Sequence, residues 1–114
     1  MREIDIHADF AQLTINFLIT PSIANLNKDS GGLIIHDRAV TKEWDFISYN
    51  SDSIKMREEI KKSKGKKTII PYKENRAVLF NSSLLHESDN YEFKEGYENR
   101  RINITILFGK RTST

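Results

Sequence analysis

Cysteine is absent from this chain of 114 residues, and histidine occurs only three times, as His7, His36 and His86. Without thiols the chain cannot form a disulfide framework, a thiolate zinc site or an iron–sulfur site. No apolar run approaches the roughly 20 residues that span a bilayer, and no basic-then-apolar leader follows Met1. We therefore expect a cytoplasmic protein with no membrane partner.

Charge is nearly balanced, since 18 basic and 16 acidic residues leave a net charge of +2. The basic excess gathers in segment 55–67, which holds seven Lys or Arg residues against two Glu. We interpret this segment as a solvated helix and loop. Nucleic-acid binding is the alternative, but the segment lacks the interleaved aromatic residues of single-strand binders. It also lacks any nucleic-acid motif, so we do not expect nucleic acid as a partner.

Short apolar runs between Gly, Pro, Asn and Asp clusters predict an all-β domain, either a sandwich or a barrel. One helix is expected over Ser51–Ser63, because a serine can cap its start and Gly65 follows its end. Segment 21–30 is expected to be a loop or a single helical turn. The predicted strands are Leu13–Thr20, Leu33–His36, Thr68–Tyr72, Arg76–Asn81 and Arg101–Phe108.

The tripeptide His7-Ala8-Asp9 is the first candidate site. On an extended strand, residues i and i+2 point to the same side, so one imidazole and one carboxylate project together. A second imidazole, from His86, would complete the two-His, one-carboxylate face of non-haem Fe(II) oxygenases. His36 and Asp37 are adjacent and would face opposite ways, so we place His36 at a strand end, at the pocket mouth or surface.

Four segments of the chain, read in order, resemble the core of the Fe(II)/2-oxoglutarate-dependent dioxygenases, in particular the prolyl-hydroxylase-like branch: HADFAQLTINFLITP, SGGLIIHD, IIPYKENRAVLFNSSLLHES and RRINITILFG. The resemblance covers nearly all of the chain. It implies an all-β double-stranded β-helix (a cupin-like jelly roll) with one helix inserted between core strands. It also implies Fe(II) bound by His7, Asp9 and His86.

By the same resemblance, 2-oxoglutarate is the cosubstrate and Arg101 holds its remote carboxylate, for which a planar, bidentate cation is suited. Arg100 competes for this role. Adjacent strand residues face opposite ways, and the inward one should share the side of Asn103 and Thr105, which favours Arg101. Asn103 and Thr105 can then line the same pocket. Asn16 either hydrogen-bonds the oxo acid or is a structural amide.

The implied reaction is oxidative decarboxylation of 2-oxoglutarate to succinate and CO2, coupled to hydroxylation of a small-molecule or peptide substrate. The alternative is a non-catalytic, cupin-like metal- or ligand-binding module. Residues 1–114 are expected to form a single core domain. It is either the C-terminal part of a longer oxygenase or a minimal core that dimerises. An exposed edge strand, such as Arg2–Ile6, favours a homodimer.

Overall fold

The computed structural model describes residues 6–39, 53–63 and 65–110, and these form a mostly β structure with one α-helix. The predicted residues Arg2 to Asp5 of the edge strand lie outside this range. The elements are β1 (Leu13–Leu18), the 3₁₀ turn η1 (Ser22–Ala24), β2 (Leu33–Ala39), α2 (Ser53–Ser63), β3 (Lys67–Ile70), β4 (Arg76–Asn81), β5 (Leu84–Ser88), the 3₁₀ turn η2 (Tyr97–Asn99) and β6 (Asn103–Phe108).

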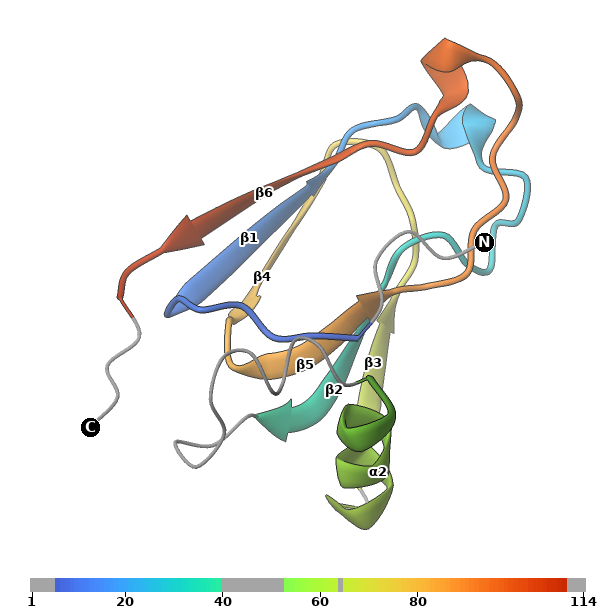
Figure 1. Cartoon of the computed structure of the whole chain (residues 1–114). Helices are drawn as coiled ribbons and strands as arrows, with labels where there is room; N and C mark the ends of the chain where they lie inside the picture. The colour runs from blue at the N-terminus through green and yellow to red at the C-terminus, as the bar shows by residue number, and fades with distance from the viewer. Residues whose placement is uncertain (1–5, 40–52, 64, 111–114) are drawn as a thin grey trace.

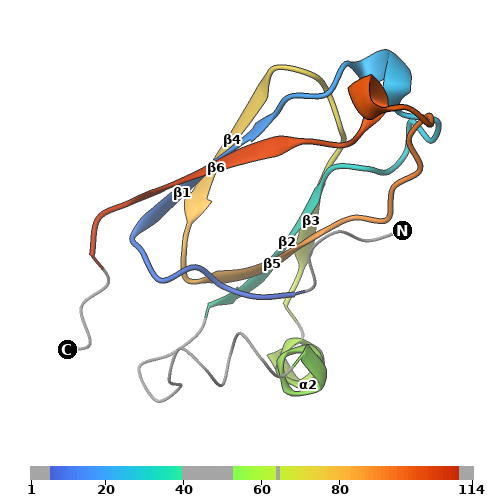
Figure 2. The same cartoon turned by 45° about the horizontal axis from the view of Figure 1, so that its top comes forward.

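The strands form two antiparallel three-stranded sheets, ordered β4-β1-β6 and β3-β2-β5 (Figures 1 and 2). The chain crosses between the sheets repeatedly, so each sheet combines strands that are distant in sequence. This arrangement is consistent with a β-sandwich and confirms the predicted β class with a helix inserted between core strands. The finer jelly-roll connectivity stays a prediction.

Strand β1 runs through the centre of its sheet and alternates strictly in burial. Thr14, Asn16 and Leu18 are buried on the side facing the second sheet. The residues between them turn to the opposite side, as the period of two requires. The sheet therefore directs polar side chains into the space between the two layers, which is where the candidate site lies.

Helix α2 lies against one end of the second sheet, on the side away from the first sheet (Figure 2). Its Met56 is fully buried and packs in a core cluster with Ile6, Ala8 and Leu85, with Ile60 against the edge of that cluster. Because Ile6 and Ala8 face the helix, their neighbours His7 and Asp9 face away from it. No helix in the described ranges is long and apolar enough to cross a membrane.

Several predicted boundaries shift in the structure. Strand Arg76–Asn81 is confirmed in full, and the expected helical turn in segment 21–30 is η1. The final strand begins at Asn103 instead of Arg101. Strand β5 was not predicted, because its sequence LLHES shows no alternation of apolar and polar residues. Four of its five residues are buried, and these include the polar His86 and Glu87.

The prediction for His36 was wrong. Strand β2 continues three residues beyond it to Ala39, and His36 is buried within the strand rather than lying at a pocket mouth or on the surface. A buried carboxylate, described below, satisfies its imidazole. A single histidine in a short apolar run gives no sign of such a partner when the partner lies 51 residues away.

Candidate metal centre

His7 and His86 lie directly opposite each other on antiparallel segments. Each donates its backbone N–H to the carbonyl oxygen of the other, at 3.0 and 2.8 Å. Residues paired in this way project their side chains to the same side of the sheet. The two imidazole rings accordingly lie with their centroids 4.3 Å apart.

Asp9 completes the group, because it follows His7 by two residues and so shares its side. One carboxylate oxygen, Oδ1, lies 3.4 Å from His7 Nε2, and the other, Oδ2, lies 3.3 Å from His86 Nε2. One potential ligand atom from each of the three residues lies within 4.8 Å of the others. Sequence positions separated by 77 residues thus converge on one point, as the His-x-Asp and distal-histidine pattern predicts.

The Asp9 carboxyl is held ionised. Burial alone would raise its pKa, but hydrogen bonds with His7 and His86, the charge of His86 and a hydrogen bond from Thr14 outweigh that effect. Together they hold the pKa of Asp9 well below its usual range. The group therefore offers a carboxylate ligand throughout the neutral and mildly acidic range.

A second layer of hydrogen bonds orients these side chains. His86 Nδ1 donates to the carbonyl oxygen of Leu84 at 2.8 Å, which fixes the proton on that nitrogen and turns Nε2 toward Asp9. Thr14 Oγ1 donates to Asp9 Oδ2 at 2.8 Å and also contacts Ser82 Oγ at 2.8 Å. Thr14 and Ser82 are fully buried. Metal ligands in proteins are oriented by supporting contacts of this kind.

The spacing of the donor atoms suits a divalent transition metal. Metal–ligand bonds of about 2.1 Å place neighbouring ligand atoms about 3.0 Å apart in an octahedral site and about 3.4 Å apart in a tetrahedral one. Each carboxylate oxygen of Asp9 lies 3.3 or 3.4 Å from one imidazole nitrogen, at the upper end of that interval, and one ligand atom from each of the three residues lies within a wider 4.8 Å of the others. Two imidazoles and one carboxylate on one face suit Fe(II), and they suit Zn(II) as well.

Both sheets line a small cavity of ≈30 Å³ beside the three residues. Asn16, Asn103 and Thr105 lie in its wall. Asn103 Nδ2 donates to Asn16 Oδ1 at 2.9 Å, and Asn16 Nδ2 donates to Thr105 Oγ1 at 3.2 Å. The sequence placed Asn103 and Thr105 in one pocket and left Asn16 either there or as a structural amide, and the structure brings all three together. The cavity has room for an ion and a water or two, but not for an oxo acid.

Arg101 occupies a different place. Of the two adjacent arginines it is the buried one, and Arg100 is exposed. Its Nε donates to the carbonyl oxygen of Gly31 at 2.8 Å and its Nη2 to that of Gly32 at 3.1 Å. Its guanidinium also lies 5.3 Å from the centre of the Tyr91 ring.

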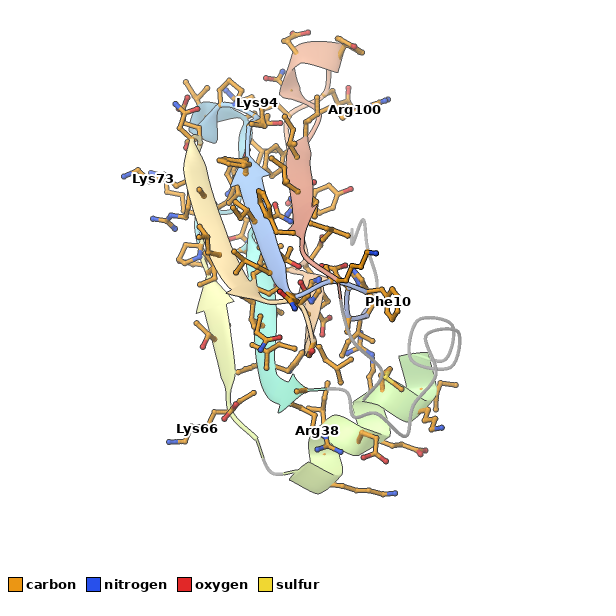
Figure 3. All side chains as sticks on the ribbon, turned by 90° about the vertical axis from the view of Figure 1, so that its left-hand side faces the viewer. Phe10, Arg38, Lys66, Lys73, Lys94 and Arg100 are labelled. Carbon is orange, nitrogen blue, oxygen red and sulfur yellow. The ribbon has the colours of Figure 1, made fainter. Side chains whose placement is uncertain are left out.

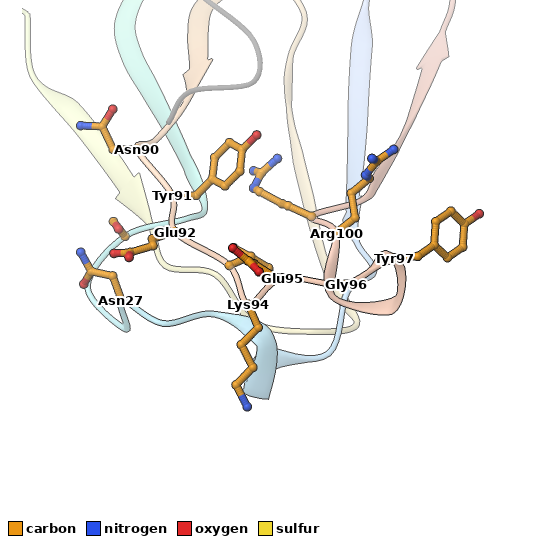
Figure 4. Close-up of a pocket in the computed structure, with 12 residues that line it drawn as sticks. Asn27, Asn90, Tyr91, Glu92, Lys94, Glu95, Gly96, Tyr97 and Arg100 are labelled. Atoms are coloured by element: carbon orange, nitrogen blue, oxygen red, sulfur yellow. The ribbon is translucent and has the colours of Figure 1, made fainter.

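A second, larger cavity of ≈1050 Å³ includes Arg101 in its wall (Figure 4). Tyr91, Glu95 and Arg100 are among the side chains around it. Among the described residues that line the smaller cavity, Arg101 is not found. The structure therefore brings His7, Asp9 and His86 together with Asn16, Asn103 and Thr105, and leaves Arg101 in the wall of the neighbouring cavity.

Sequence reasoning missed the supporting residues Thr14 and Ser82. Thr14 had one available signal, because it shares the inward side of β1 with Asn16. Ser82 had none, since it lies in the short connection between β4 and β5 and its partner is 68 positions away.

A second histidine–carboxylate cluster was also missed. His36 Nε2 lies 2.8 Å from Glu87 Oε2, and Arg57 of α2 donates to both oxygens of Glu87, at 3.2 and 3.4 Å. Glu87 is almost fully buried. The cluster ties α2 to strands β2 and β5 on the covered side of the sheet.

Comparison of the chain with protein-family models, with curated proteins and with solved structures finds no match.

Proposed function

We propose that the protein is an Fe(II)-dependent oxygenase that uses 2-oxoglutarate as its cosubstrate. The observation that carries this proposal is the convergence of His7, Asp9 and His86 on one side of a sheet, with a polar wall opposite them. A ferrous ion, when bound, supplies the redox chemistry that couples decarboxylation of the oxo acid to hydroxylation of a substrate. The substrate is a small molecule or a peptide.

Under this proposal each residue has a defined task. His7 and His86 present Nε2 lone pairs, and Asp9 supplies the negative charge that favours a divalent cation. The Leu84 carbonyl holds the Nδ1 proton of His86, so that Nε2 is the nitrogen that faces Asp9 and would give up its proton when a metal binds. Thr14 holds one oxygen of Asp9 in place. Asn16, Asn103 and Thr105 offer hydrogen bonds to a ligand in the cavity.

Arg101 is the residue proposed to hold the remote carboxylate of the oxo acid. Burial among the rings of Tyr72 and Tyr91 would strengthen its attraction for an anion. For this task the wall between the two cavities must open, since the guanidinium contacts the carbonyls of Gly31 and Gly32. Binding of 2-oxoglutarate would then make the two cavities continuous.

The decisive experiment adds Fe(II) and 2-oxoglutarate to the purified protein without oxygen. A visible charge-transfer absorption is expected, followed by succinate formation when oxygen is admitted. H86A should lose both signals. H36Q is the matched control, because His36 lies on the other side of the same sheet and should leave both signals in place. Absence of the absorption in the wild-type protein at millimolar oxo acid would refute the proposal.

The second candidate is a metal-binding module without turnover. Two observations favour it, namely the small volume beside His7, Asp9 and His86 and the engagement of Arg101 with backbone carbonyls. This candidate predicts that the protein binds a divalent metal through the same three residues and forms no succinate. Metal titration combined with the succinate assay separates the two functions.

A further inference from the structure

The outer face of sheet β4-β1-β6 is apolar. The side chains that point away from the second sheet are Leu13, Ile15, Phe17 and Ile19 on and after β1, Ala77, Leu79 and Asn81 on β4, and Ile102, Ile104, Ile106 and Phe108 on and before β6. None of them carries a charge, although 30% of the chain's residues do. In Figure 3, which looks toward this sheet, the labelled Lys73, Lys94 and Arg100 lie near the strand ends.

The outward side of this sheet departs from the pattern usual for an antiparallel sheet with one solvated face. Such sheets place apolar residues inward and polar residues outward. Here the inward row mixes the polar Thr14, Asn16, Asn103 and Thr105 with apolar residues such as the buried Leu18 and Phe80. The outward row is apolar throughout, apart from Asn81. Its hydrophobic residues therefore do not serve the inner core, and their burial requires something that lies outside this sheet.

The second sheet shows what such a cover does. Its outer face packs against α2, and there Met56 and Leu85 are fully buried. On the first sheet, by contrast, Leu79 is 59% exposed, Ile104 is 51% exposed and Phe108 is 47% exposed. Within the described ranges no helix lies over these residues. The outer face of the second sheet is thus packed against a helix, whereas the large apolar side chains on the outer face of the first sheet stay partly exposed.

The exposed area decides what could cover this face. Seven of its large side chains are between 36% and 59% exposed, which amounts to roughly 600 Å² of apolar surface, at the top of the range for the largest patch on a monomer. Two such faces together would bury roughly 1,200 Å², which reaches the size of a specific, stable interface. A single patch is therefore large enough for a two-fold dimer in which each copy presents the same face.

We infer that this face, defined by the outward residues of β1, β4 and β6, is the contact surface for a second copy of the chain. Two twisted sheets pack face to face about 10 Å apart with their strands nearly aligned, and uncharged residues satisfy such a contact without desolvating any ion. The dimer forms through the face of this sheet and not through an edge strand. This inference does not depend on the proposed oxygenase function.

Sedimentation equilibrium across micromolar concentrations tests the inference. The wild-type protein should have twice the mass of the chain. The substitution I104E, and separately L79E, should shift it to the mass of one chain, while circular dichroism still reports a folded β protein. I54E on α2 is the matched control, because Ile54 is 72% exposed on another element and should leave the dimer intact.

A cross-linking experiment covers the case in which a charged variant fails to fold. Because the chain has no cysteine, I15C and I54C each carry one thiol. Ile15 lies in the middle of the face, so oxidation of I15C should yield a covalent dimer, and oxidation of I54C should not. A wild-type protein that stays monomeric at 100 micromolar overturns the inference. An open series of larger oligomers, or a monomer that binds neutral phosphatidylcholine vesicles, overturns it too.

Discussion

Strand β5 lies between two clusters, one on each side of the sheet, that each pair histidine with a carboxylate but differ in their third residue. His86 turns to the inner side of the sheet and joins His7 and Asp9, whereas its neighbour Glu87 turns to the outer side and joins His36 and Arg57. Both clusters are mostly buried, and both pair imidazole with carboxylate. All three residues of the inner cluster line the small cavity together with residues of the opposite sheet, and Glu87 is the one described member of the outer cluster that also borders it.

The difference between them lies in the third member. In the inner cluster it is a second imidazole, which a divalent cation can use as a ligand. In the outer cluster it is a guanidinium, which donates to both oxygens of Glu87 and which never loses its charge. A cation would have to displace Arg57 and would be repelled by it. The inner cluster therefore has the donor set of a metal site, whereas the outer cluster attaches α2 to the sheet.

The largest expected effect concerns metal affinity. D9N removes the only carboxylate of the inner cluster, and the affinity for Co(II) or Fe(II) should fall by about 1,000-fold, beyond the 10–100-fold that follows loss of a supporting partner. E87Q makes the same chemical change on the other side of the sheet and should alter the affinity by less than about threefold. Calorimetric titration measures both. Equal losses in the two variants would contradict the division between the clusters.

The second effect concerns stability. E87Q leaves His36 and Arg57 without their carboxylate partner and should lower the free energy of unfolding by about 3 kcal/mol, the low end for breaking a buried ion pair, because Arg57 can regain water. D9N should lower the free energy of unfolding of the metal-free protein by less than E87Q does. Urea denaturation with chelator present compares them. A larger loss in D9N would show that the inner cluster, and not the outer one, holds the fold together.

A third effect tests the supporting layer of the inner cluster. T14V removes the hydroxyl that donates to Asp9 Oδ2 while keeping the shape of the side chain. Metal affinity should fall by about 10- to 100-fold. T14S restores the hydroxyl and should recover most of the affinity. If T14V binds metal as well as the wild type does, Thr14 is a packing residue only.

The smallest effect is a pH dependence of stability. In metal-free protein the pKa of Asp9 lies below that of the unfolded carboxyl, which is about 3.9. The ionised group therefore stabilises the fold above about pH 4, and that contribution is lost as the pH falls below it. The difference in free energy of unfolding between wild type and D9N should shrink by about 1 kcal/mol from pH 6 to pH 3. A constant difference would contradict this.

The parts of the site that lie within one extended segment were predictable. His7 and Asp9 share a side because of the period of two, and the same rule placed Asn103 and Thr105 together across from the outward isoleucines. The choice of Arg101 over Arg100 as the inward arginine agrees with their burial. Its assignment to the oxo acid stays a prediction, because the guanidinium lies against Gly31 and Gly32.

Gly32 shows why that arrangement could not be anticipated. A Cβ atom at this position would lie 1.8 Å from the carbonyl oxygen of Ile70, so only glycine allows the two strands to approach so closely. This approach, together with the Gly31 and Gly32 carbonyls, forms the surface that Arg101 contacts. The Gly-Gly pair can be seen in the sequence. Its contacts cannot, because Ile70 lies 38 residues and Arg101 lies 69 residues after Gly32.

By itself, the sequence determined the class of the fold, the side of each strand on which its residues lie and the chemical set available for a metal, because these follow from local alternation and composition. The tertiary structure decided which histidine meets Asp9, which carboxylate meets Arg57 and which face of the sandwich is left apolar and uncovered. Those outcomes depend on the register between strands far apart in the chain. A shift of one residue in β5 would exchange His86 and Glu87 between the two sides of the sheet.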